Sequence, residues 1–242
     1  MLRLGATVRR PTYPWTPVIY QLLRHLESVG FPYAPRVLGV DGQGREVLTF
    51  IEGESGPDGW AKVVDERGIA AMARLLREYH QAVAGFRPDG AVTWAAHTGP
   101  PASSEVVCHG DFGPWNLVWQ GYRPVGILDW DYAWPTRPIH DVAYALEYVA
   151  PFRDDEQCLR WLRYLHPPDR RRRLEIFAEA YGLDSTTGLV DEVIHQQQQV
   201  LDRALRLAAD GRQPQAHWQA TGRLRRVAEG IQWSRDHRHL FE

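Results

Sequence analysis

The spacing of hydrophobic residues predicts an amphipathic helix near the start of the chain. Between Trp15 and Val29, apolar residues recur every three or four positions, as one buried face of a helix requires. Thr16 is expected to cap this helix, with Pro17 at its first position, where a backbone N–H has no helical partner. The N-terminal segment therefore leads directly into a helix.

Short apolar runs on either side of this helix predict strands. Residues 1–10 have a strand-like pattern, and the runs at 35–40 and 46–51 are joined by a polar turn with two glycines, which is typical of a β-hairpin. A polar, glycine-rich break follows the second run. We therefore expect a small α+β unit in residues 1–53 and a second unit in residues 54–242.

The second unit is expected to be mainly helical. Residues 69–83 carry an apolar stripe at helical spacing, and residues 88–104, rich in proline, glycine and serine, are predicted to form a loop. The glutamine tract at 196–199 and the arginines at 170–173 are interpreted as solvent-facing sides of helices. The further helices that the pattern predicts are at 140–150, 154–165, 169–182, 188–209 and 216–234.

Residues 105–134 interrupt the helical pattern. Two short apolar runs, 117–119 and 125–128, flank the turn at 121–124, which contains glycine and proline. A second hairpin is therefore predicted here, with polar residues standing just before it and just after it.

Composition narrows the class of protein. The 242 residues are 44% apolar with a formal net charge of −2, which indicates one or two folded domains and no global field that would recruit nucleic acid or an anionic membrane. The two cysteines, Cys108 and Cys158, exclude a disulfide scaffold and suit a reducing compartment. No apolar run approaches the roughly 20 residues that span a bilayer, and the N-terminus lacks a signal-peptide pattern. We expect a cytoplasmic protein; the sequence does not indicate its oligomeric state.

Four polar residues have the spacing that phosphoryl transfer requires. The reaction needs a carboxylate that orients or deprotonates the attacking hydroxyl, and oxygen ligands that hold Mg²⁺ against the nucleotide phosphates. Protein kinases supply these with H-x-D-x4-N followed by a metal-binding aspartate. His109-x-Asp111-x4-Asn116 repeats that spacing, and Asp129 follows the predicted hairpin. An aspartate near a glycine often only forms a turn, but the combined spacing favours a catalytic site.

The segment 105–147 resembles the aminoglycoside-phosphotransferase and choline-kinase-related family, through HGDFGPWN and the later ILDWDYAWPTRPIHDVAYAL. The resemblance implies an α+β, protein-kinase-like fold of two lobes. The N-terminal lobe would be reduced to a short antiparallel sheet and one helix, and the C-terminal lobe would be mainly helical with a catalytic hairpin. The implied function is transfer of the γ-phosphate of ATP or GTP, with Mg²⁺, to a hydroxyl of a small molecule such as an aminoglycoside-like compound or an amino alcohol.

The resemblance also implies roles for the residues of the motif. Asp111 would be the catalytic base, and His109 would brace its loop. Asn116 and Asp129 would be the Mg²⁺ ligands.

Further residues would support this site or bind the nucleotide. Asp131 would be a secondary acidic group near the metal. Asp141 would brace the catalytic loop, cap its own helix, or do both. Phe50, Ile51 and Glu52 would belong to the segment that joins the lobes and contacts adenine.

The first 30 residues depart from the family pattern. Members have a glycine-rich loop over the phosphates, then a strand lysine paired with a helix glutamate, whereas residues 1–30 contain no lysine and begin too late to hold the loop. Arg9 or Arg10 stands where the lysine is expected, and arginine keeps the charge but changes the geometry. The lysine–glutamate pair is expected to be absent. A non-catalytic protein that binds a nucleotide or another ligand is therefore the alternative, and a metal-dependent hydrolase is a weaker one.

Overall fold

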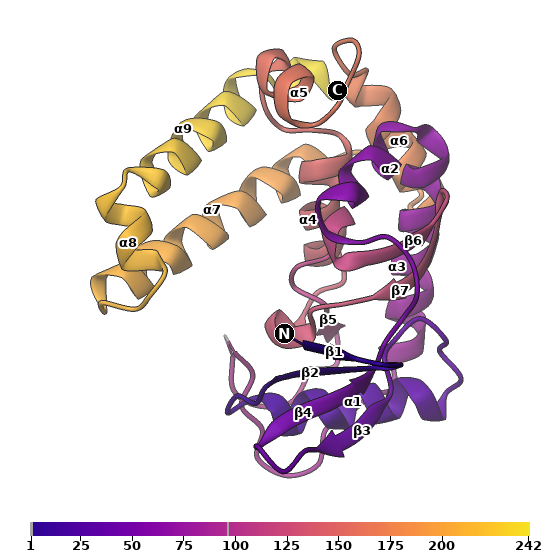
Figure 1. The fold of residues 1–242 in the computed structure, drawn as a ribbon. Coiled ribbons are helices and arrows are strands. Elements are labelled where there is room, and N and C mark those ends of the chain that lie inside the picture. Colours follow the sequence, from indigo (N-terminus) through magenta and orange to yellow (C-terminus); the bar gives the residue numbers. More distant parts are fainter. Residues whose placement is uncertain (1, 96) are drawn as a thin grey trace.

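The computed structural model, which describes residues 2–95 and 97–242, consists of an N-terminal antiparallel sheet with one helix and a larger, mainly helical part (Figure 1). Met1 and Ala96, which belong to the predicted N-terminal strand and the predicted loop, lie outside the described residues. The predicted α+β class is confirmed. Among the described residues, no helix combines the length and hydropathy needed to cross a lipid bilayer.

The N-terminal sheet is built from neighbouring antiparallel strands in the order β1-β2-β4-β3. The predicted hairpin between the third and fourth strands is confirmed. Because side chains alternate between the two faces of a strand, consecutive residues of β2 lie on opposite faces of the sheet. The strands are β1 (Leu2–Leu4), β2 (Thr7–Pro11), β3 (Val37–Val40) and β4 (Arg45–Thr49).

Helix α1 (Thr16–Ser28) covers this sheet, with Leu22, Leu23 and Leu26 buried on one face. The predicted cap was wrong by one residue. Trp15 occupies the N-cap position without a side-chain hydrogen bond, and the buried Thr16 hydroxyl instead accepts the backbone N–H of Tyr13 at 2.8 Å. The threonine therefore stabilises the turn that leads into the helix.

The second part contains eight helices among the described residues. Its predicted helices are present, with two corrections to their bounds. The helix predicted at 154–165 ends earlier, before Arg163 with its positive φ, and the one predicted at 216–234 is broken into two at Gly222, where φ is +71°. The short helix α2 was not predicted. The helices are α2 (Gly59–Val64), α3 (Glu66–Val83), α4 (Ile139–Val149), α5 (Asp155–Trp161), α6 (Arg170–Tyr181), α7 (Leu189–Ala209), α8 (Gln215–Ala220) and α9 (Arg223–Asp236).

Helix α3 lies at the centre of the hydrophobic core. Ile69, Met72 and Leu76 on its apolar face are fully buried, and the core continues from α1 through α3 to α6 and α7. The buried Tyr79 hydroxyl donates to the carbonyl of Val107 at 2.7 Å. Because that carbonyl belongs to the strand before the polar motif, the core helix fixes the place where the motif begins.

Four short strands hold the polar motif. β6 (Leu117–Gln120) and β7 (Arg123–Ile127) form the predicted hairpin. β5 (Val106–Cys108) pairs antiparallel with β8 (Trp134–Thr136), a pairing that was not predicted. This second pair brings the two ends of the segment together, so the residues before and after the hairpin lie in one place.

The prediction of solvent-facing polar tracts was wrong for two residues in each tract, whereas Arg171, Arg172 and Gln199 are exposed as predicted. Arg170 and Arg173 are buried, because their guanidinium groups donate to the carbonyls of Pro151 at 3.0 Å and Val149 at 2.6 Å, at the end of α4. On α7, Gln196 and Gln197 are also buried. A polar run is therefore no reliable marker of a solvated helix face in this protein.

Candidate functional site

The loop after β5 is held in one conformation by Asp141 of α4. The buried Asp141 carboxylate accepts the backbone N–H groups of His109 at 2.6 Å and Gly110 at 2.8 Å. Gly110 has φ +76°, and a Cβ there would stand 2.2 Å from the carbonyl oxygen of Tyr132, so only glycine fits. The loop is thus fixed by backbone hydrogen bonds and by close packing.

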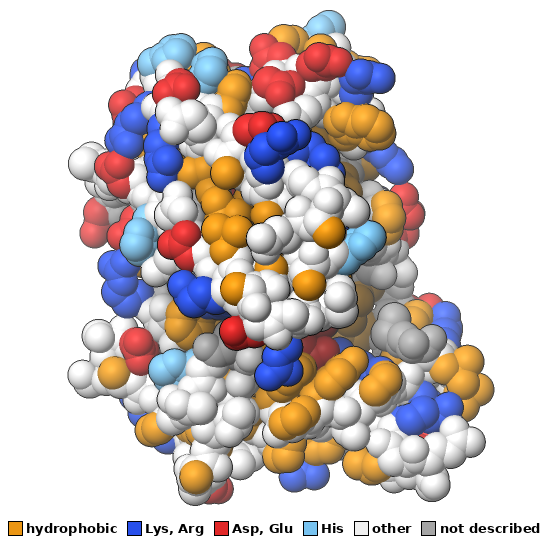
Figure 2. Space-filling view, turned by 90° about the vertical axis from the view of Figure 1, so that its left-hand side faces the viewer, with side chains coloured by type: hydrophobic (Ala, Val, Ile, Leu, Met, Phe, Trp, Pro, Cys, Tyr) orange, Lys and Arg blue, Asp and Glu red, His pale blue; other side chains and the backbone are white. Residues whose placement is uncertain are grey.

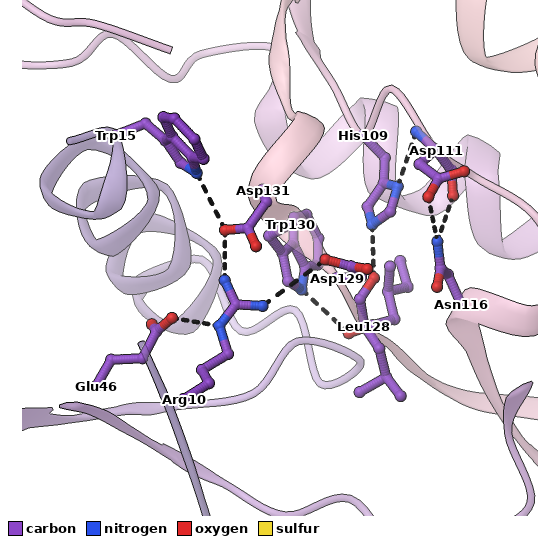
Figure 3. Close-up of polar contacts among 11 residues, drawn as sticks. Arg10, Trp15, Glu46, His109, Asp111, Asn116, Leu128, Asp129, Trp130 and Asp131 are labelled. Atoms are coloured by element: carbon purple, nitrogen blue, oxygen red, sulfur yellow. Dashed lines mark hydrogen bonds and ion pairs between the residues drawn. The ribbon is translucent and has the colours of Figure 1, made fainter. Parts of the chain in front are cut away.

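His109 connects this loop to the segment after β7. Its Nδ1 accepts the backbone N–H of Asp111 at 3.3 Å, and its Nε2 lies 2.8 Å from the carbonyl oxygen of Leu128 (Figure 3). These partners require the tautomer that carries its proton on Nε2. Since Leu128 directly precedes Asp129, the buried imidazole sets the position of one aspartate relative to the other.

Asp111 presents its carboxylate beside two hydrogen-bond donors. Oδ2 accepts the Asn116 amide at 2.8 Å, and Oδ1 accepts the hydroxyl of Tyr144 from α4. Burial raises the pKa of Asp111 above its ordinary value, although the hydrogen bonds from the Tyr144 hydroxyl and the Asn116 amide oppose that shift. A positioned carboxylate with a raised pKa has the properties of a general base.

Asp129 stands in an uncommon backbone conformation. Its φ of 58° and ψ of 64° lie in the left-handed region, which non-glycine residues rarely occupy and which costs free energy. Its side chain is 46% exposed, and Oδ1 lies 3.7 Å from a guanidinium nitrogen of Arg10. The backbone therefore holds an open carboxylate opposite the Asp111–Asn116 pair (Figure 3).

Arg10 of β2 is surrounded by three carboxylates. It pairs with Glu46, which faces it across the β2–β4 register, and with Asp131, in addition to the contact with Asp129. The Trp15 indole also donates to Asp131, at 3.2 Å. Glu46 is 1% exposed, and burial raises its pKa while the ion pair with Arg10 opposes the shift.

The donor set of this cluster fits a hard cation. One guanidinium faces three carboxylates, so the cluster keeps an excess of negative charge when all are ionised. Asp129 and Asn116 offer oxygen atoms, which are the ligands that Mg²⁺ prefers, and Mg²⁺ needs few protein ligands when phosphate and water supply the others.

Seven of the predicted site residues lie together, whereas Arg9 and the three residues predicted to contact adenine have other partners. Arg9 is on the opposite face of β2, where its Nε is 3.6 Å from Asp41. Arg10, which stands in place of the lysine, has an acidic partner that comes from β4 instead of α1. The predicted residues that the structure brings together are Arg10, His109, Asp111, Asn116, Asp129, Asp131 and Asp141.

The segment between the sheet and α2 has contacts of its own. The Phe50 ring lies 3.6 Å from the guanidinium carbon of Arg3, and Glu52 forms an ion pair with the same arginine. Ile51 packs beside Gly126 of β7. Adenine binding by Phe50, Ile51 and Glu52 stays a prediction.

Sequence reasoning missed three residues of the site. Tyr144 lies three residues after Asp141 on α4, a helical spacing that would place it on the same side. Glu46 could have been identified only from strand register, and Trp15 only from the packing of α1. None of the three belongs to the local motif.

Comparison with known sequences identifies related proteins. A model of the phosphotransferase enzyme family matches residues 87–177. A trifolitoxin immunity protein from Rhizobium leguminosarum bv. trifolii is 35% identical over 199 residues, a match that covers 79% of this chain and 74% of that protein.

Solved structures share the fold. A choline/ethanolamine kinase family protein from Mesorhizobium loti superposes with a TM-score of 0.60 at 16% identity, covering 98% of this chain and 86% of that one. An amicoumacin kinase in complex with AMP-PNP and Ca²⁺ superposes with a TM-score of 0.58 at 13% identity, covering 93% and 80% of the two chains. These similarities confirm the predicted protein-kinase-like fold with its small N-terminal sheet and mainly helical C-terminal part.

Proposed function

The chain belongs to the phosphotransferase enzyme family, and we propose that it transfers the γ-phosphate of ATP or GTP to a hydroxyl group of a small molecule. The observation that carries the proposal is the position of Asp111, whose half-buried carboxylate is held by Asn116 and lies across from Asp129 (Figure 3). Positioning and electrostatic stabilisation account for most of the rate in phosphoryl transfer, and this site supplies both.

In this reaction the acceptor hydroxyl would donate its proton to Asp111 as its oxygen attacks the γ-phosphorus. The bond between that phosphorus and the β-phosphate oxygen would break, and the nucleoside diphosphate would leave. Asn116 and Asp129 would hold Mg²⁺, which supplies positive charge to the phosphate oxygens. Asp141 and His109 would hold the loop of Asp111 at a fixed position relative to Asp129.

Arg10 would contact the phosphates in place of the lysine that other members use. Glu46 and Asp131 hold its guanidinium beside Asp129. Because Glu46 belongs to the same sheet as Arg10, this ion pair does not depend on the position of α1. Arginine also offers two donors in one plane, which suits a phosphate.

Nucleotide binding is expected to require the metal. Titration with AMP-PNP should show at least about tenfold weaker binding when Mg²⁺ is chelated or when Asp129→Asn removes a ligand. Mutation of a residue that supports a metal ligand already lowers metal affinity by about tenfold or more. The measurement is calorimetry on the whole chain, with Asp210→Asn on the exposed end of α7 as the control. Equal affinity with and without Mg²⁺ in the wild type would argue against the assigned metal site.

Tyr144→Phe is expected to shift the pH dependence of the transfer. The Tyr144 hydroxyl donates to the charged form of Asp111 and so lowers its pKa; without it the pKa rises further above the ordinary value. The acidic limb of the kcat/KM profile should therefore move to higher pH. Profiles of the variant and of Tyr122→Phe, in the exposed hairpin turn, provide the comparison. An unchanged limb in both would show that Asp111 is not the titrating group.

The relative that is named an immunity protein supports a protective role, in which the acceptor is a toxic compound. A second mechanism for protection is binding without transfer. The observation in its favour is that the guanidinium of Arg10 lies against Asp129 and Asp131, the acidic groups next to the proposed metal. A cell-based protection assay with Asp111→Asn separates these two mechanisms. Protection by binding alone would persist without the base, whereas protection by phosphate transfer would be lost.

A further inference from the structure

A cleft of about 870 Å³ extends from Tyr144, next to the proposed base, into the helical part of the molecule. Its walls come from α4, the start of α5, α7, α8 and α9, and it begins at Tyr144, whose hydroxyl donates to Asp111. Its volume suits a drug-sized molecule. A compound in this cleft would have one end at Asp111.

The charges along the cleft are balanced. Three acidic residues and three arginines line it: Glu147, Asp154 and Glu229, and Arg153, Arg223 and Arg226. Burial also raises the pKa of Glu147, although Arg153 and the Gln197 amide oppose that shift. The cleft therefore has no excess of negative charge that would attract a polycation.

Arginines also cover the aromatic rings of the cleft. An exposed aromatic face is a binding site for a cationic amine, but here a guanidinium already lies over three of the five aromatic rings that line the cleft. Arg223 and Arg153 themselves line the cleft, so a cation that approached Trp218 or Tyr148 there would meet their positive charge. The pairs are Arg223 over Trp218 at 4.3 Å, Arg170 over Trp233 at 5.3 Å and Arg153 over Tyr148 at 5.5 Å.

Two neighbouring glutamines of α7 provide uncharged polar groups in the wall of the cleft. Gln196 and Gln197 line the cleft and are only 2% and 6% exposed. Among the described residues, neither amide atom of Gln196 has a hydrogen-bond partner, nor does Oε1 of Gln197. A buried amide without a partner costs stability, so its presence beside a cleft indicates that a ligand completes it. A side-chain amide offers one donor and one acceptor group, and a second amide matches both.

Apolar side chains make up the rest of the wall. Phe152, Leu201 and Ile231 are buried at the cleft, and Val200 and Val227 are exposed beside it. On the face that α7, α8 and α9 present at the left of Figure 1, apolar side chains lie among both basic and acidic groups (Figure 2). The cleft thus suits an apolar body with few charges.

We propose that the acceptor is an uncharged compound that carries a hydroxyl and at least one amide group on an apolar body, as in a short capped peptide, and not a polycationic amino sugar. The proposal rests on the proposed phosphotransferase function for the role of the hydroxyl. The ligand class follows from the cleft itself, namely its balanced charge, the arginines beside its aromatic rings and the unpaired amide atoms of Gln196 and Gln197.

Direct binding to the whole chain without nucleotide tests this ligand class. The probes are acetylated, carboxamide-terminated tripeptides with serine between leucine and phenylalanine, an analogue with one amide replaced by an ester, and gentamicin as the polycation. We expect the peptides to bind at least about tenfold more tightly than gentamicin, and the ester to lose about tenfold, which is the usual effect of one hydrogen bond to a buried group. Tighter binding of gentamicin, or no peptide binding at millimolar concentration, would overturn the proposal.

A pair of matched variants separates ligand recognition from a structural role. Gln196→Leu should leave the Tm unchanged or raise it, because it removes unpaired buried polar atoms, while peptide affinity falls about tenfold. Gln199→Leu, an exposed position on the same helix outside this cleft, should change neither. A lower Tm with unchanged peptide affinity in Gln196→Leu would assign that residue to the fold and contradict the proposal.

The failures of the two proposals are distinguishable. Phosphorylation of gentamicin without peptide binding would retain the phosphotransferase and overturn the ligand class. Peptide binding without any phosphate transfer in the presence of ATP, GTP and Mg²⁺ would retain the ligand class and overturn the transfer.

Discussion

Asp111→Asn is expected to lower kcat for phosphate transfer by about 10²- to 10⁴-fold, the range over which a positioned general base contributes. Asparagine keeps the shape of the side chain, and its carbonyl oxygen can still accept one of the hydrogen bonds from Asn116 and Tyr144. It cannot take the proton of the acceptor hydroxyl. The measurement is the initial rate of nucleoside diphosphate release with a saturating acceptor.

Two controls make this result interpretable. Asp184→Asn changes an exposed aspartate after α6 and should leave the rate unaltered. Binding of AMP-PNP to Asp111→Asn should persist, because the metal and phosphate contacts are assigned to other residues. A variant that turns over at the wild-type rate would rule out Asp111 as the base, whatever the substrate.

Asp141→Ala is expected to reduce the free energy of unfolding by about 3–5 kcal/mol, as is usual when one partner of a buried charged network is removed. The wild-type carboxylate is fully buried and accepts from His109, Gly110 and the His80 imidazole, the last at 3.1 Å. Without it, the backbone N–H groups of His109 and Gly110 and the Nε2 of His80 would lose their acceptor, although the other ring nitrogen of His80 keeps the Tyr181 hydroxyl. Denaturant titration of the wild type and variant measures the difference.

The pH dependence gives this prediction a second test. Burial by itself would raise the pKa of Asp141, but the hydrogen bond from His80 and the charge of that imidazole bring it below its ordinary value. A carboxyl with a lowered folded-state pKa adds stability above its unfolded pKa, about 3.9, and loses it as the pH falls through the folded value. The difference between wild type and Asp141→Ala should therefore narrow below about pH 4. A constant difference down to pH 2, or a loss no larger than that of exposed Asp184→Ala, would contradict the structural role.

The long elements were predictable because each depends on a local pattern. The apolar stripe at 69–83 became the central helix α3, and the runs at 117–119 and 125–128 became the β6–β7 hairpin. Errors occurred where a short segment depends on partners that are distant in the sequence. The strands β5 and β8 are three residues each, too short for periodicity to reveal them, and they exist because they pair with one another. The boundary near residue 53 stays a prediction.

Buried polar residues were the least predictable. Charge and amide groups normally favour water, so a sequence pattern alone places Arg173 and Gln196 on a solvated face. Arg173 is buried because the end of α4 provides carbonyl acceptors for its guanidinium. Gln196 is buried because α7 packs along α4 beside the cleft. In both cases the decisive partner lies on another element.

The sequence by itself determined the identity and spacing of His109, Asp111, Asn116 and Asp129, because these residues stand on one loop and hairpin whose geometry is local. Tertiary structure alone decided which of the two neighbouring arginines faces them. Strand alternation directs Arg9 toward Asp41 and Arg10 toward Asp129, and the strand register then supplies Glu46 as the acidic partner. The reason is physical: a motif within one segment fixes its own distances, whereas contacts between segments depend on how strands pair and helices pack.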